Sequence, residues 1–86
     1  MNVVFHKRFE KMAKKLSPKV KQKMVERIEL FTNDPLNSQL RNHALHTPYK
    51  GSYSIDITGD YRAVYVLVDE ATAMFTHIGT HSQLYR

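Results

Sequence analysis

The 86-residue sequence contains no cysteine, which excludes disulfide bonds, thiolate metal sites and thiol nucleophiles. This absence fits a reducing compartment. The sequence also lacks an apolar run of membrane-spanning length, and its first residues lack the apolar segment and cleavage site of a secretory signal. We therefore expect a soluble, cytoplasmic protein with no membrane association.

Acidic residues are scarce, because 8 Asp and Glu stand against 13 Lys and Arg. The excess of positive charge lies in residues 1–31, which hold nine Lys and Arg but three Glu. A basic face on a small domain is typical of proteins that meet a polyanion or an acidic partner. Charge alone does not separate that role from a surface that only maintains solubility.

The length predicts a single domain over residues 1–86. A chain this short buries about 60–65% of its unfolded surface, so its core is small. We expect no large internal cofactor, and we expect function on the surface or in a shallow groove.

The first half of the chain has the apolar spacing of two helices. Residues 3–5 predict a short strand, and apolar residues every three or four positions then predict helices near 6–16 and from 18 to about 32. Ser17-Pro18 starts the second helix, because Ser favours the N-cap and Pro the first helical position. The tight joint predicts an antiparallel helical hairpin.

The second half changes to the alternation of strands after an irregular stretch at 33–51. Strands are predicted at 53–58, 61–68 and 72–78, with short turns that favour an antiparallel meander. The order β-α-α-β-β-β predicts an α+β fold, in which a basic helical hairpin packs on one face of a small antiparallel sheet. The opposite, polar face is expected to be open.

The register of the first hairpin decides where Arg62 lies. A three-residue loop at 58–60 sets Arg62 opposite Asp56, whereas a two-residue loop at 59–60 sets it opposite Ile57. We favour the three-residue loop, because it aligns the apolar residues of both strands.

Several side chains suit acid–base cleavage of an RNA phosphodiester. The 2′-hydroxyl of the substrate is the nucleophile, so the protein needs a base, an acid and a cation for the phosphate. The candidates are His43, Asp56, Arg62, His81 and Tyr85.

Structural roles are open for the same residues. Arg62 could form an end-of-strand salt bridge to Asp56 or Asp60. Tyr85 could stack on a base or anchor the C-terminus, and His81 could be a loop histidine that bonds a backbone carbonyl. No metal site is expected, because the histidines lack ligand spacing on a helix face and no cysteine is present.

Four segments carry a resemblance to a known family: Leu40-Arg41-Asn42-His43-Ala44-Leu45, Gly51-Ser52-Tyr53-Ser54-Ile55-Asp56-Ile57, Gly59-Asp60-Tyr61-Arg62-Ala63-Val64-Tyr65 and Ile78-Gly79-Thr80-His81-Ser82-Gln83-Leu84-Tyr85. The whole chain resembles toxins of bacterial type II toxin–antitoxin systems, in the RelE/ParE superfamily and closest to its YafQ-like branch. The resemblance implies a ribosome-dependent, metal-independent mRNA endonuclease.

The resemblance also implies roles for single residues. His43 matches the first catalytic histidine, His81 the general acid, and Tyr85 a functional aromatic residue. Asp60 matches a catalytic acidic position, and Arg62 matches an arginine that stabilises the phosphate.

Asp56 departs from the family pattern, because YafQ-like toxins can carry His there and RelE-type toxins Lys. An acid at this position cannot stabilise negative charge. It could act as the base, or it could orient His81 or Arg62.

The implied partners are the ribosome, its mRNA and a cognate antitoxin protein, with operator DNA bound only through the antitoxin complex. The basic helices would face ribosomal RNA. The RNA-binding candidates are Lys7, Lys11, Lys14, Lys15, Lys50 and Arg86.

Two other functions remain open for this fold. One is a non-catalytic, ParE-like inhibitor of DNA gyrase, and the other is a degenerate toxin that only binds antitoxin. His43, His81 and Tyr85 favour the nuclease, because a gyrase inhibitor would not need them.

Overall fold

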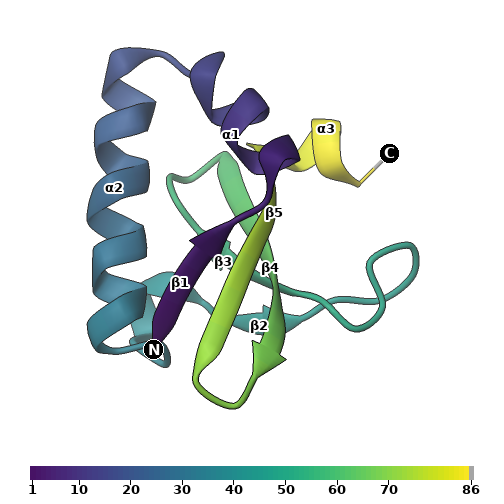
Figure 1. The fold of residues 1–86 in the computed structure, drawn as a ribbon. Helices are drawn as coiled ribbons and strands as arrows, with labels where there is room; N and C mark the ends of the chain where they lie inside the picture. Colours follow the sequence, from purple (N-terminus) through teal and green to yellow (C-terminus); the bar gives the residue numbers. More distant parts are fainter. Residues whose placement is uncertain (86) are drawn as a thin grey trace.

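The computed structural model describes residues 1–85 and contains helices, strands and one short 3-10 helix. The elements in chain order are β1 (Asn2–Phe5), α1 (Lys7–Lys14), α2 (Pro18–Asn33), the 3-10 helix η1 (Ser38–Leu40), β2 (His43–Ala44), β3 (Tyr53–Asp56), β4 (Tyr61–Asp69), β5 (Thr72–Thr80) and α3 (His81–Leu84). The predicted α+β fold is confirmed, and η1, β2 and α3 are additions to the predicted elements (Figure 1).

The five strands form one mixed sheet in the order β1-β5-β4-β3-β2. Strands β3, β4 and β5 pair antiparallel with their neighbours, as predicted, and β2 adds an antiparallel pairing with β3. The sheet is not wholly antiparallel, however, because β1 pairs parallel with β5. Parallel neighbours need a long connection, and here almost the entire chain runs between the two strands.

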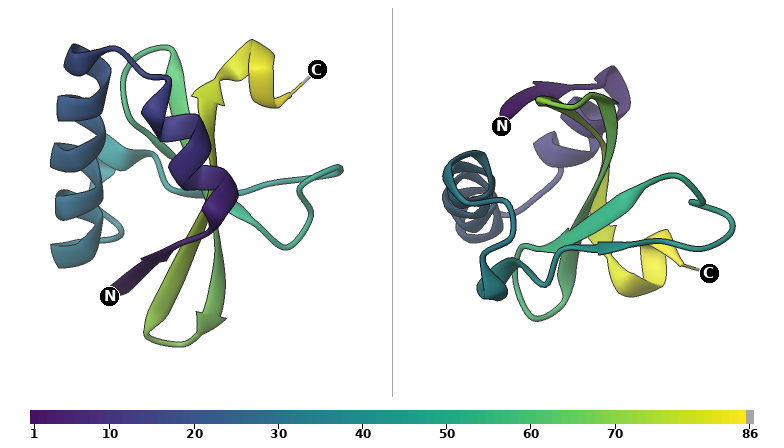
Figure 2. Two further views of the ribbon diagram at one scale, coloured as in Figure 1. Left: turned by 45° about the horizontal axis from the view of Figure 1, so that its top comes forward. Right: turned by 90° about the horizontal axis from the view of Figure 1, so that it is seen from below.

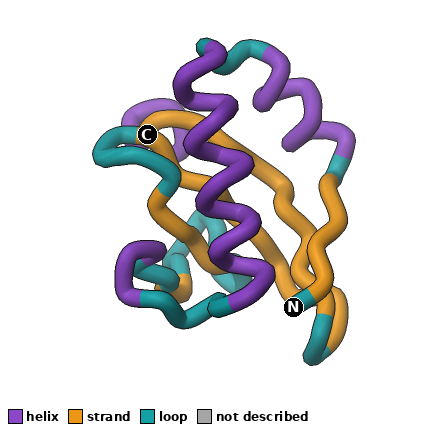
Figure 3. Tube along the Cα trace, turned by 90° about the vertical axis from the view of Figure 1, so that its left-hand side faces the viewer, coloured by secondary structure: helices purple, strands orange, loops and turns teal. Residues whose placement is uncertain are grey.

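Helices α1 and α2 cover one face of the sheet, and α3 lies on the other side (Figure 2). When the molecule is viewed from the side on which α2 lies, this helix runs across the strands behind it (Figure 3). Phe9 of α1 and Phe31 of α2 are buried against Phe75 of β5, with ring centroids 5.8 and 5.4 Å away. These aromatic contacts join the helical hairpin to the centre of the sheet.

Both helices begin where side chains cap them. The Ser17 hydroxyl accepts a hydrogen bond from the Val20 N–H at 3.3 Å, and Pro18 opens α2, which confirms the predicted start. His6 caps α1, because its Nδ1 accepts from the Arg8 N–H at 3.0 Å.

The hairpin between β3 and β4 has the predicted three-residue register. Asp56 lies opposite Arg62, and Ile55 lies opposite Ala63. The apolar partners are fully buried in the core. The sheet face behind Ser54 is not open as expected: Ser54 is fully buried, and the Tyr85 hydroxyl lies 3.4 Å from its Oγ.

A β-bulge interrupts the pairing of β4 with β5. Val64 pairs with His77, but the next residue, Tyr65, pairs with Phe75, so Thr76 has no partner of its own. The extra residue moves the following side chains of β5 to the other face. The side chain of His77 consequently lies on the same side of the sheet as α3, whereas Phe75 and Ile78 are buried in the core.

No helix within residues 1–85 has the length and apolar character needed to cross a membrane.

Candidate active site

A cavity of about 340 Å³ with a mixed polar and apolar lining lies between the end of the sheet, the loop after β2 and α3. Its lining combines cationic, imidazole and hydroxyl groups from distant parts of the sequence: Arg41, His43, Leu45, His46, Thr47, Ser54, Arg62, His81 and Tyr85. Four of the six predicted catalytic residues therefore line one cavity. Asp56 and Asp60 do not line the cavity, but Asp56 forms ion pairs with Arg41 and Arg62, which do.

His43 sits on β2, opposite Ser54 of β3. Its Nδ1 lies 2.7 Å from the carbonyl oxygen of Arg41. A carbonyl oxygen only accepts hydrogen bonds, so Nδ1 carries the hydrogen and Nε2 of the neutral ring keeps its lone pair. His43 is an exposed residue, and its Nε2 is consequently suited to accept a proton.

His81 is the first residue of α3, and its backbone is fixed by a capping box. The Thr80 hydroxyl accepts from the Gln83 N–H at 3.2 Å, and the Gln83 side chain accepts from the Thr80 N–H at 2.8 Å. The imidazole of His81 is exposed, and its ring centroid lies 4.7 Å from that of Tyr85. His81 therefore belongs to a helix. The interpretation of His81 as a loop histidine is wrong in this respect.

Asp60 contributes its backbone to this region. Its carbonyl oxygen accepts a hydrogen bond from the His81 N–H at 3.2 Å, which joins α3 to the turn before β4. The Asp60 residue itself is exposed.

Asp56 lies between two arginines. Its Oδ2 is 2.9 Å from Nε of Arg41, and its Oδ1 is 3.0 Å from Nε of Arg62. Oδ1 is buried and has no hydrogen bond from the described residues, because the Arg62 N–H is close but not aligned with it. The salt bridge between Arg62 and Asp56 matches one interpretation of the sequence.

Arg62 also binds the backbone of its own turn. Its Nη1 donates to the carbonyl oxygens of Thr58, Gly59 and Tyr61 at 3.1, 3.2 and 3.1 Å. Its side chain is only 14% exposed. Arg62 thus holds the turn and the Asp56 carboxylate together at the floor of the cavity.

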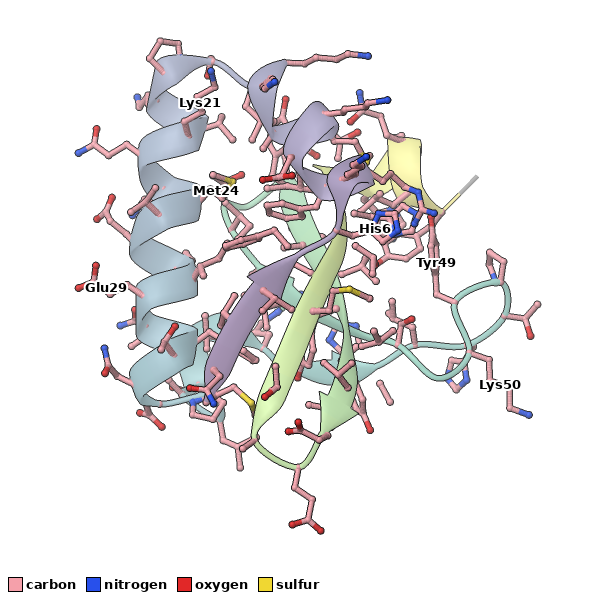
Figure 4. All side chains as sticks on the ribbon, in the orientation of Figure 1. His6, Lys21, Met24, Glu29, Tyr49 and Lys50 are labelled. Carbon is pink, nitrogen blue, oxygen red and sulfur yellow. The ribbon has the colours of Figure 1, made fainter. Side chains whose placement is uncertain are left out.

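Tyr85 belongs to a cluster of aromatic rings beside the cavity. Tyr49 meets the ring of Tyr85 edge-on at 5.7 Å and the ring of His77 edge-on at 5.2 Å. Tyr49 points from the loop towards α3, whereas Lys50 points away from it (Figure 4). The cluster attaches the loop that carries His46 to the C-terminal helix.

His77 supports this cluster as a neutral group. Burial lowers its pKa, and the positive charges of Arg8 and His6 lower it further. Its Nε2 lies 3.4 Å from Nη1 of Arg8, which can only donate, so Nδ1 of His77 donates to the Thr76 hydroxyl at 2.9 Å.

The predicted RNA-binding residues are spread over two regions. Four exposed lysines lie on α1 or directly after it: Lys7, Lys11, Lys14 and Lys15. Lys50 lies in the loop after β2, and Arg86 lies outside the described residues. Helix α1 and α3 lie at the same end of the sheet (Figure 1).

Sequence reasoning missed Arg41, His46 and Tyr49 as parts of this region. Arg41 directly precedes Asn42-His43, which is a signal for its proximity to the base. Its left-handed backbone, with φ 46° and ψ 46°, had no sequence signal, because glycine usually occupies that conformation. Within residues 1–85, no three His, Asp or Glu side chains gather as a metal site.

Comparison with protein families gives one match over the whole chain. The family model described as "Bacterial toxin of type II toxin-antitoxin system, YafQ" matches residues 1–86. No curated protein matches the chain significantly.

Solved structures of toxins share the fold. YafQ from E. coli strain BL21(DE3) is 22% identical, with a TM-score of 0.82, and the match covers 99% of this chain and 98% of that one. A chain of the E. coli DinJ–YafQ toxin–antitoxin complex is 21% identical, with a TM-score of 0.79 and coverage of 99% and 97%. The YoeB/ParE toxin from Agrobacterium tumefaciens is 16% identical, with a TM-score of 0.76 and coverage of 94% and 99%.

Proposed function

Because this chain belongs to the YafQ family of toxins from bacterial type II toxin–antitoxin systems, we propose that it cleaves mRNA on the ribosome. The observation that carries the proposal is the convergence of His43, His81 and Arg41 on one cavity. These groups include a proton acceptor, a proton donor and a cation. Cleavage by the RNA's own 2′-hydroxyl needs no further nucleophile and no metal.

In this mechanism His43 is the general base. Its Nε2 takes the proton of the 2′-hydroxyl, because Nδ1 is already bonded to the Arg41 carbonyl. The 2′-oxygen then forms a bond to phosphorus, and the bond from phosphorus to the 5′-oxygen breaks. The products are a 2′,3′-cyclic phosphate and a 5′-hydroxyl end.

His81 is the general acid and gives its proton to the departing 5′-oxygen. Its exposed ring lies beside the half-buried Tyr85, an aromatic residue of the kind on which a base of the substrate could stack. General acid–base catalysis of this kind contributes about 10²–10⁴-fold to a rate.

Asp56 is a positioning residue in this proposal and not the base. Both of its oxygens lie within 3.0 Å of an arginine Nε, so the carboxylate is already engaged by two guanidinium groups. Asp60 supports His81 through its backbone carbonyl.

The proposed partners are the ribosome and an antitoxin protein. The exposed lysines of α1 can neutralise phosphates of ribosomal RNA without sequence preference. The E. coli relative forms a toxin–antitoxin complex, and we extend an antitoxin partner to this chain. A ribosomal substrate would place the activity in the cytoplasm, and operator DNA would be met only through the antitoxin complex.

The test is primer extension on a reporter mRNA in a purified translation system. Wild-type protein is compared with His81→Gln and with the control His6→Asn, which removes a histidine outside the cavity but keeps a residue that can cap α1.

Cuts that need ribosomes, occur with wild type and His6→Asn, and are strongly reduced in His81→Gln would support the proposal. Intact mRNA with wild-type protein would refute it, and a gyrase supercoiling assay would then test the ParE-like alternative.

A further inference from the structure

Two arginines, Arg41 and Arg62, flank Asp56, but they differ in how many of their side-chain N–H donors remain without a hydrogen-bond partner. Arg62 uses Nη1 on three carbonyl oxygens and directs Nε at Asp56, and its side chain is 14% exposed. An arginine has five N–H donors, so Arg62 keeps only those on Nη2 for a ligand.

Arg41 has the opposite character. Its side chain is 68% exposed, and its only side-chain ion pair or hydrogen bond within residues 1–85 joins Nε to Oδ2 of Asp56 at 2.9 Å. Four N–H donors on Nη1 and Nη2 are therefore available to a ligand in the cavity that Arg41 lines. Paired donors of this kind match the geometry of a phosphate group.

The backbone holds Arg41 in place. Its N–H donates to the Ser38 carbonyl oxygen at 3.3 Å, and its φ of 46° is rare for a residue other than glycine. The next residue, Asn42, donates to the Pro35 carbonyl oxygen at 2.9 Å and accepts from the Tyr65 hydroxyl at 2.8 Å. Rarely populated backbone conformations that their surroundings support occur preferentially at functional sites.

Arg41 is also tied to the proposed base. Its carbonyl oxygen orients His43, and its guanidinium lines the same cavity. In RNA the attacking 2′-hydroxyl and the scissile phosphate are adjacent, so they call for a base and a cation in the same cavity, as His43 and Arg41 are. The ion pair with Asp56 restrains the Arg41 guanidinium, and the two arginines with one carboxylate leave a net positive charge.

We infer that Arg41 is a catalytic residue that binds the scissile phosphate, while Arg62 is a positioning residue that holds Asp56 and the turn before β4. The inference rests on the proposed function. It reverses the role that the family resemblance implied for Arg62.

The first experiment measures single-turnover cleavage of mRNA on programmed ribosomes. Arg41→Gln is expected to lower the rate about 10²–10³-fold, as loss of a preorganised donor does. Arg41→Lys keeps the charge but not the paired donors, so it should recover part of the rate. The thermal unfolding midpoint of both variants should stay near that of wild type, because Arg41 is largely exposed.

A double variant separates phosphate binding from simple neutralisation of Asp56. If Arg41 acts on phosphate, Arg41→Gln combined with Asp56→Asn stays as slow as Arg41→Gln alone or becomes slower. If Arg41 only offsets the carboxylate, removal of that carboxylate restores the rate and overturns the inference. An Arg41→Gln variant that cleaves at the wild-type rate overturns it as well.

A second experiment remains decisive if wild-type protein cleaves no mRNA, the outcome that refutes the proposed function. The isolated protein is titrated with a 2′-deoxy dinucleotide, which contains the phosphodiester but not the nucleophile. The arginine Nε–H signals are followed by NMR. A shift of the Arg41 signal that is larger than that of Arg62 supports the phosphate site. A dominant shift of Arg62, or no shift of either signal at millimolar ligand, refutes it.

Discussion

Nδ1 of His43 lies 2.7 Å from the carbonyl oxygen of Arg41, two residues earlier in the chain. This contact selects the tautomer of His43 that leaves Nε2 open, and it makes the ring orientation depend on the left-handed backbone of Arg41. A short stretch of chain thus controls both the proposed base and the proposed phosphate-binding cation. The stretch is held to the core by Asn42 and Tyr65.

Replacement of His43 by alanine should lower single-turnover cleavage about 10²–10⁴-fold, because it removes the proposed general base. His6→Asn is the control and should cleave at the wild-type rate. An unchanged rate in His43→Ala would show that another group takes the proton.

Tyr65→Phe should reduce the free energy of unfolding by about 1–2 kcal/mol. Tyr65 is buried, and its hydroxyl donates to Oδ1 of Asn42 at 2.8 Å, an acceptor that would lose this partner. Burial also raises the pKa of Tyr65, so its phenol remains a donor at neutral pH.

Urea denaturation measures this effect, with Tyr53→Phe as the matched control. Tyr53 stacks on Tyr65 at 5.3 Å, but its hydroxyl has no hydrogen bond to the described residues. Equal losses in the two variants would contradict the role of the bond to Asn42.

Gly79→Ala should loosen α3. An added Cβ would lie 2.8 Å from Oε1 of Gln83, and the Gln83 side chain would have to leave the Thr80 N–H that it caps. Loss of a cap costs about 1 kcal/mol. His81 and Tyr85 should lose their fixed positions, so cleavage should fall together with the thermal midpoint.

Gly59→Ala is the control for this substitution, because no atom lies within 4 Å of a Cβ added there. A midpoint in Gly79→Ala that equals the control value would show that Gln83 relaxes without cost. Gln83→Ala should reproduce the effect of Gly79→Ala.

His77→Gln should weaken the dependence of stability on pH. The pKa of His77 is lowered in the folded protein by burial and by Arg8 and His6. As pH falls below the ordinary histidine pKa of about 6.5, the unfolded chain takes up the proton first. The stability that neutral His77 provides is therefore present above that pH and is lost as pH falls through the lower, folded value.

Thermal unfolding at pH 7.5 and pH 5.5 measures this contribution. The thermal unfolding midpoint of wild type should fall further between pH 7.5 and pH 5.5 than the midpoint of His77→Gln does, since glutamine does not titrate. Identical losses would mean that other groups account for the acid dependence.

Local patterns in the sequence were sufficient for several elements. The spacing of apolar residues predicted both helices, and Ser17-Pro18 marked the start of α2, because caps and helical periods depend on neighbouring residues. The register of Arg62 against Asp56 was also predictable, since a slip by one residue would turn the apolar side chains of β3 out of the core.

The sequence by itself therefore determined the helical hairpin, the central antiparallel strands and the residue types suited to acid–base chemistry. Only the tertiary structure decided that β1 joins β5 in parallel and that the bulge at Thr76 turns His77 towards α3. It also decided that Nη1 of Arg62 is bound to backbone carbonyl oxygens, whereas Nη1 and Nη2 of Arg41 have no hydrogen-bond partner within residues 1–85. The physical reason is that periods and caps are local, whereas these contacts join residues that are distant in sequence and meet only when the whole sheet has formed.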